Sequence, residues 1–228
     1  MKKWIPIIII IILMLIVYFS GVTKYLTFET IKENRQLILS YIDQYPLLMP
    51  FLFTLIYVVM TALSLPGGAL LSILGGFIFG VPLSTIYVVV GATIGATIIF
   101  SAARTAMGDL LKRKAGPFLL KMETGFQKNA ASYLLFLRLI PLFPFWLVNI
   151  APAFFNVKTR TYLWTTFLGI IPGAYVFTQA GNGLGAIFDS GKELSVETVF
   201  NIEIKIALIV LALFALIPIF VKRLRRDR

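Results

Sequence analysis

Two apolar segments, each broken by glycine and proline, dominate the sequence and look like copies of one another. The first covers residues 65–80 and the second residues 141–157, and an apolar stretch with a Gly-x-x-x-Gly motif follows each. Identical residues recur 78 positions apart at Pro66 and Pro144, Phe77 and Phe155, Gly91 and Gly169, Gly95 and Gly173, Ala96 and Ala174, and Ala102 and Ala180. Paired broken segments in two halves of a membrane protein indicate a transport site near the middle of the bilayer. The alternative is coincidence, because proline and Gly-x-x-x-Gly are common in membrane helices.

Long apolar runs indicate a polytopic membrane protein. Hydrophobic residues make up 59% of the sequence, charged residues only 14%, and the mean hydropathy is +0.91. Several runs reach the roughly 18 apolar residues that a membrane-spanning helix needs. We therefore expect an all-α polytopic membrane protein with about five spans, two opposed re-entrant helical hairpins in an inverted repeat, and amphipathic surface helices. The expected spans are residues 4–20, 46–63, 81–103, 162–180 and 204–221.

These segments divide the chain into three parts. They are an N-terminal anchor helix (residues 1–22), a core (23–181) whose inverted repeat comprises residues 65–103 and 139–180, and a polar loop, last span and basic tail (182–228). The core opens with residues 23–45, whose periodicity predicts an amphipathic surface helix with a capping box at Thr30 and Glu33. An ordinary solvated connector is the alternative for this segment.

The charge pattern and the missing residue types narrow the function classes. The net charge is +11, but the basic residues lie in loops and at the tail, which suits anionic lipid headgroups better than nucleic acid. The chain has no cysteine and no histidine, which excludes disulfides, thiol chemistry and most zinc and copper sites, and removes the commonest general base. We expect no metal, no cofactor and no enzymatic activity.

The glycines and prolines are expected to shape the two hairpins and to allow close helix packing. Residues 65–80 contain five glycines and one proline, and a straight helix would lose about 1 kcal/mol for each glycine and about 3 for the proline. A re-entrant hairpin can use these residues as its turn, provided that its backbone is buried or lines a watery cavity. The hairpin and packing residues are Pro66, Gly67, Gly68, Gly75, Gly76, Gly80, Gly91, Gly95, Pro141, Pro144, Gly169, Pro172 and Gly173.

Basic residues near the spans predict the orientation. The tail (residues 222–228) and the loop at 104–138 are the most basic segments, so both should be cytoplasmic. The first hairpin then opens outside and the second inside, which makes the two copies inverted. One conflict remains, because five spans place Lys2 and Lys3 outside.

Three polar side chains are candidates for substrate binding. Arg138 borders the second broken segment, and a guanidinium offers the paired donors that match a phosphate. Arg104 ends the span before the basic loop, and either arginine could instead snorkel to the interface and only set topology. Asn149 lies in an apolar run, where it could cap the hairpin turn or contact a headgroup.

An ordered set of motifs resembles a known family. The motifs are Pro66-Gly-Gly, Gly75-Gly-x-x-x-Gly80, Phe100-x-x-x-Arg104, Arg138-x-x-Pro141-x-x-Pro144 with Asn149, and Gly169-x-x-Pro172-Gly173. Over residues 27–181 they are similar to the DedA/VTT superfamily, also called the SNARE-associated Golgi protein family, and most of all to its Tvp-type bacterial branch. The resemblance implies opposed re-entrant hairpins that meet at mid-membrane, lipid scrambling or flipping, and a place in the bacterial plasma membrane.

The sequence departs from that family in two respects. DedA proteins are expected to carry acidic residues in the hairpin region, whereas residues 65–103 and 139–180 contain neither Asp nor Glu. Proton coupling through a membrane carboxylate is therefore not expected. Ala153 also stands where the family usually has a glycine.

Three functions remain open on sequence alone. The first is a lipid transporter, flippase or scramblase that moves phospholipid or polyprenyl-phosphate headgroups between the two hairpins. The second is a small-solute or anion transporter, and the third is a membrane structural or assembly factor. The expected partners are membrane lipids with anionic headgroups and not nucleic acid, and a homo-oligomer is compatible with the sequence.

Overall fold

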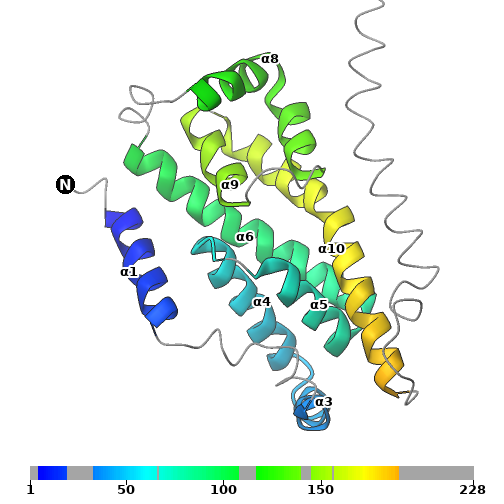
Figure 1. The fold of residues 1–228 in the computed structure, drawn as a ribbon. Coiled ribbons are helices and arrows are strands. Elements are labelled where there is room, and N and C mark those ends of the chain that lie inside the picture. The colour runs from blue at the N-terminus through cyan, green and yellow to red at the C-terminus, as the bar shows by residue number, and fades with distance from the viewer. Residues whose placement is uncertain are drawn as a thin grey trace, which may run out of the picture.

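The computed structural model describes residues 5–19, 33–65, 67–107, 117–139, 145–155 and 157–189, and every regular element in these ranges is an α-helix. The helices are α1 (Ile5–Phe19), α3 (Arg35–Gln44), α4 (Leu48–Ala62), α5 (Gly68–Phe79), α6 (Val81–Met107), α8 (Pro117–Leu139), α9 (Phe145–Phe154) and α10 (Thr159–Asp189), as Figure 1 shows. The all-α prediction is confirmed for this part of the chain. The predicted last span and basic tail, residues 204–228, lie outside the described residues.

The order of helices repeats. In each half a short apolar helix, α5 with 12 residues or α9 with 10, directly precedes a long helix, α6 with 27 residues or α10 with 31. The two long helices pack against each other, and each short helix packs against the long helix of the other half. The halves therefore interlock in one body, with α6 and α10 crossing at its centre (Figure 1).

Helices α4 and α5 form one hairpin. α4 has 15 residues and is about 22 Å long. It ends beside Gly95, halfway along α6. The chain then reverses, with Ser64 at φ 52° and Gly67 at φ 141°, and α5 returns to Gly80, immediately before α6. α4, which covers most of the predicted span 46–63, is thus one arm of this hairpin, and the number of spans stays a prediction.

Of the glycines expected at the turn of the first hairpin, Gly67 lies at the reversal of the chain, whereas Gly75 and Gly76 do not. Both residues lie inside α5, where a continuous helix is possible because the turn falls earlier, after Ala62. A Cβ on Gly76 would overlap the carbonyl of Thr178, and one on Gly181 would overlap that of Ile73. These glycines therefore let α5 and α10 cross with their backbones in contact.

The second hairpin opens toward the other end of α6. α8 starts at Pro117, breaks at Asn129 (φ −160°, ψ 90°), and ends at Leu139. α9 then runs to the C-terminal end of α6, where the carbonyl of Val157 accepts a hydrogen bond from Arg104. The α4–α5 hairpin opens toward the N-terminal end of α6 instead. The two hairpins are thus opposed with respect to this helix.

Two further boundaries differ from the sequence analysis. α10 continues to Asp189, so the first eight residues of the predicted polar part 182–228 are helical. α3 begins at Arg35 after Asn34, and the predicted capping box stays a prediction, because Thr30 lies outside the described residues. None of the α3 residues is buried, as expected for a surface helix.

The outer surface is apolar. Large hydrophobic side chains are exposed along α1, α4, α6 and α10, among them Ile16, Phe51, Ile86, Phe167 and Leu168. Within the described ranges α6 is long and apolar enough to cross a membrane over Val81–Ala106, and α3 and α4 pass together only as a pair bent by 115°. A surface of this kind suits contact with lipid.

Candidate functional site

A cavity of about 350 Å³ lies where the two hairpins meet. The turn of the first hairpin contributes Leu65, Gly67 and Gly68, and the second contributes Arg138 and Phe145. The remaining walls come from α4, α5, α6 and α10. Because α4 ends halfway along α6, the cavity lies near the middle of the long helices.

Arg138 is the one charged side chain among the described residues that line the cavity. Its Nη2 donates to Tyr162 Oη and to Thr166 Oγ1, both at 3.0 Å. Its Nε and Nη1 are buried and have no hydrogen-bond partner within the described part of the chain. The guanidinium lies 5.7 Å from the ring of Phe145 and 5.5 Å from that of Tyr162, so aromatic faces partly offset its charge.

Tyr162 joins Arg138 to the protein interior. Its ring is fully buried and stacks on Phe100 with centroids 4.1 Å apart. Its hydroxyl accepts from Arg138 and can donate to Asn149 Oδ1 at 3.1 Å or to the carbonyl of Ala96 at 3.2 Å. One hydroxyl therefore connects α6, α8, α9 and α10.

Asn149 is fully buried in the protein interior. It lies in the interior of α9, so it caps no turn, and it is not among the residues that line the cavity. Its Oδ1 accepts from Tyr162, and its buried Nδ2 has no partner among the described residues. The amide supports the tyrosine that holds Arg138.

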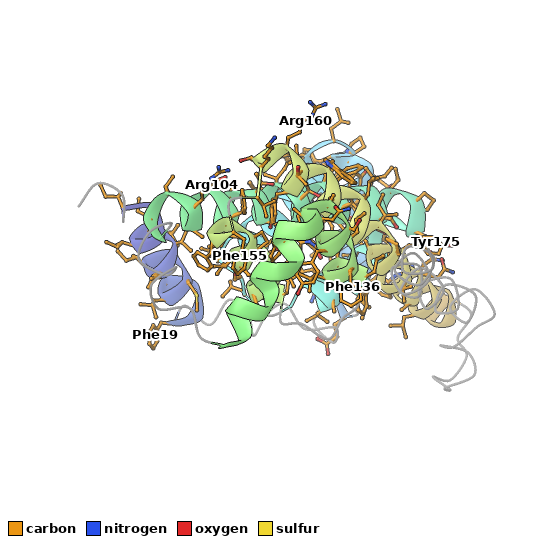
Figure 2. The ribbon with its side chains drawn as sticks, turned by 90° about the horizontal axis from the view of Figure 1, so that it is seen from above. Phe19, Arg104, Phe136, Phe155, Arg160 and Tyr175 are labelled. Carbon is orange, nitrogen blue, oxygen red and sulfur yellow. The ribbon has the colours of Figure 1, made fainter. Side chains whose placement is uncertain are left out.

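Arg104 lies apart from the cavity. Its Nη1 donates to Thr159 Oγ1 at 3.1 Å and to the carbonyl of Val157 at 3.4 Å, so it ties the end of α6 to the start of α10. Figure 2 shows Arg104 and Arg160 at the same edge of the molecule. The structure does not bring Arg104 together with Arg138 at one binding site.

A pair of hydroxyl groups lines the cavity on the side of the first hairpin. Tyr57 Oη and Ser72 Oγ lie 3.1 Å apart, and both are within hydrogen-bond distance of the carbonyl of Gly68. The sequence analysis missed these residues together with Tyr162 and Thr166. Tyr162 and Thr166 are four residues apart, which places them on one helix face, but single hydroxyls in an apolar run do not identify a site.

The Gly-x-x-x-Gly motifs lie on the long helices. Gly91 faces Tyr57 and Gly95 faces Val58 and Thr61, so α6 packs closely on α4. Gly169 faces Arg138, and Gly173 lines the cavity. Pro172 lies inside α10, which continues through it. The predicted hairpin residues Pro66, Pro141 and Pro144 lie outside the described residues.

The sequence matches a family model and several curated proteins. The model of the VTT domain covers residues 65–183. Transmembrane protein 41B of Mus musculus is 30% identical over 175 residues, and the human protein is 29% identical over the same length; each alignment covers 75% of this chain and 58% of the relative. The transmembrane protein 41 homolog of Dictyostelium discoideum is 28% identical over 200 residues, covering 86% of this chain and 58% of the relative. The chain thus spans a little over half the length of these relatives. No solved structure matches.

Proposed function

The chain belongs to the VTT domain family, which includes the DedA and SNARE-associated proteins, and on that premise we propose that this membrane protein moves lipids between the two leaflets. The substrates are phospholipids or polyprenyl phosphates, whose headgroups pass through the cavity between the hairpin tips. Arg138 binds the phosphate. The apolar walls accept the parts of the lipid nearest the headgroup.

The observation that carries this proposal is the pair of nitrogens on Arg138 that have no partner among the described residues. A buried guanidinium is costly inside a membrane unless its donors are paired. The Nη2 atom is already used by Tyr162 and Thr166, which leaves the Nε and Nη1 donors for a ligand. A phosphate oxygen matches them in charge and hydrogen-bonding capacity, and charge-assisted bonds of this kind are among the strongest in proteins.

Transport is passive and bidirectional in this account. A proton-coupled transporter needs a titratable group near its site, and residues 65–103 and 139–180 contain no Asp or Glu. The described residues that line the cavity include no Asp or Glu either. The lipid then follows its own concentration gradient between the leaflets.

The α4–α5 hairpin supports a membrane arrangement with four spans. If this hairpin re-enters from one side, the spans are α1, α6, α10 and residues 204–221. The N-terminal Lys2 and Lys3, the basic residues between 104 and 128, and the tail then all lie on the cytoplasmic side, as the positive-inside rule requires. This arrangement removes the conflict that five spans created.

Reconstitution into liposomes tests the proposal against its alternatives. Fluorescent phosphatidylglycerol in both leaflets should become accessible to an external quencher in the presence of the protein. Uptake of a small anion without lipid movement would favour the solute transporter instead. Absence of both activities from folded protein would favour a structural or assembly role.

A further inference from the structure

The two long helices share one contact at the first glycine of each motif. A Cβ on Gly91 would lie 2.9 Å from Cβ of Tyr57, on α4. A Cβ on Gly169 would lie 3.6 Å from Leu135 Cδ2 and 2.8 Å from Cβ of Arg138, on α8. The 78-residue offset relates Gly91 to Gly169 and also Tyr57 to Leu135. One contact therefore follows the repeat, whereas the closest contact of Gly169, to Arg138, has no equivalent among the atoms nearest to Gly91.

At the second glycine of each motif, Gly95 or Gly173, the α4–α6 pair differs from the α8–α10 pair. A Cβ on Gly95 would lie 2.5 Å from the carbonyl oxygen of Val58 and 2.7 Å from Cβ of Thr61, so α4 and α6 are closed there. A Cβ on Gly173 would meet no heavy atom of the described residues within 4 Å, and Gly173 lines the cavity. The α8–α10 pair is thus open one turn beyond the point where Arg138 packs on Gly169.

We infer that Gly173 is the contact on which α8 closes in a second conformation, as α4 closes on Gly95 in this one. Repeats that share a sequence pattern can adopt each other's packing, and rocking of one repeat against the other is the usual basis of alternating access. The inference rests on the proposed lipid transport, since it explains how the cavity opens and closes. A glycine is needed at position 173 because any side chain would stand between the two backbones.

Closure acts directly on the proposed headgroup site. Arg138 lies at the end of α8, next to the gap between α8 and Gly173 on α10. When that end of α8 moves onto Gly173, the space beside the free Nε and Nη1 atoms is lost. The bound phosphate is then expelled toward the opposite side of the membrane. During this movement α8 pivots about its contact with Gly169.

The residues that should meet Gly173 follow from the repeat. The equivalents of Thr61 and Val58 are Leu139 and Phe136. The chain has no cysteine, so each pair can be tested by disulfide formation without a background. We expect Leu139→Cys with Gly173→Cys, and Phe136→Cys with Gly173→Cys, to form an intramolecular disulfide on oxidation in liposomes, and scrambling to fall at least tenfold until the bond is reduced.

Two controls make the experiment decisive. Thr85→Cys with Thr178→Cys should form a disulfide under the same conditions, because these hydroxyls lie 2.8 Å apart. Single-cysteine variants identify bonds between two protein molecules. If the control pair bonds but neither Gly173 pair does, or if the bonded protein scrambles at the normal rate, the inference is overturned. Disulfide formation is detected as a shift in gel mobility, which does not depend on lipid movement. A bonded pair in a protein that never scrambles lipid would therefore reject the proposed function and retain the closure.

Discussion

The guanidinium of Arg138 is held by the hydroxyl of Tyr162, which accepts its Nη2–H at 3.0 Å from within the buried core. Tyr162→Phe removes this acceptor but keeps the stacking on Phe100. A hydrogen bond to a charged group contributes roughly 1.5–3 kcal/mol, so we expect the free energy of unfolding to fall by about that amount. Reversible unfolding in detergent measures the change.

A matched substitution is available on the same helix. Tyr175 is 43% exposed on α10, and Tyr175→Phe should change stability by less than about 0.5 kcal/mol. Equal effects of the two substitutions would show that the bond from Arg138 to Tyr162 adds nothing to stability.

The backbone crossing of α5 and α10 predicts opposite effects for two glycine substitutions. Gly76→Ala would place a methyl group on the carbonyl of Thr178, and we expect a loss of at least about 2 kcal/mol through forced separation of the helices. Gly173→Ala meets no described residue and removes a helix-interior glycine, so it should be neutral or stabilising by up to about 1 kcal/mol. Thermal unfolding of both variants compares them directly. Destabilisation by Gly173→Ala and not by Gly76→Ala would contradict the described packing.

Four spans and five spans differ in where α3 lies. With α4–α5 as a re-entrant hairpin, α3 is outside and the turn at Lys158 is cytoplasmic; five spans place both inside. Ser40 and Lys158 are exposed, so single cysteines there should react with an impermeant maleimide from opposite faces of the membrane. Labelling of both positions from the same face would restore the five-span arrangement.

Passive transport predicts no response to a pH gradient. Because no carboxylate occurs in residues 65–103 or 139–180, an imposed gradient should leave the final distribution of lipid between the leaflets unchanged. The distribution is measured by external quenching of a fluorescent lipid at equilibrium. Accumulation of lipid in one leaflet only under a gradient would require a proton carrier elsewhere in the protein.

The sequence singled out one residue of the cavity wall but placed several helix boundaries wrongly. Arg138 could be found because a charge beside an apolar Gly/Pro-broken segment is unusual, and the structure places it on the cavity wall. The hairpin was misplaced because the apolar run of α4 is long enough to resemble a span, while the turn at Ser64 and Gly67 is set by tertiary packing. Tyr162 was overlooked because its partners come from three other helices, and no local pattern records such contacts.

The central claim is that the Arg138 guanidinium binds a phosphate headgroup during transport, and the scrambling rate of Arg138→Lys tests it most directly. Lysine keeps the positive charge but loses the planar guanidinium. In the guanidinium, Nη2 donates to Tyr162 and Thr166, while Nε and Nη1 have no partner among the described residues. The loss of a charge-assisted hydrogen bond corresponds to roughly a tenfold to hundredfold decrease in affinity or rate. The account predicts that Arg138→Lys, reconstituted at equal protein content, scrambles fluorescent phosphatidylglycerol at least tenfold more slowly than the unmodified protein, and that Arg138→Ala is slower still. Scrambling by Arg138→Lys at the unmodified rate would contradict the account and leave Arg138 as a topology signal.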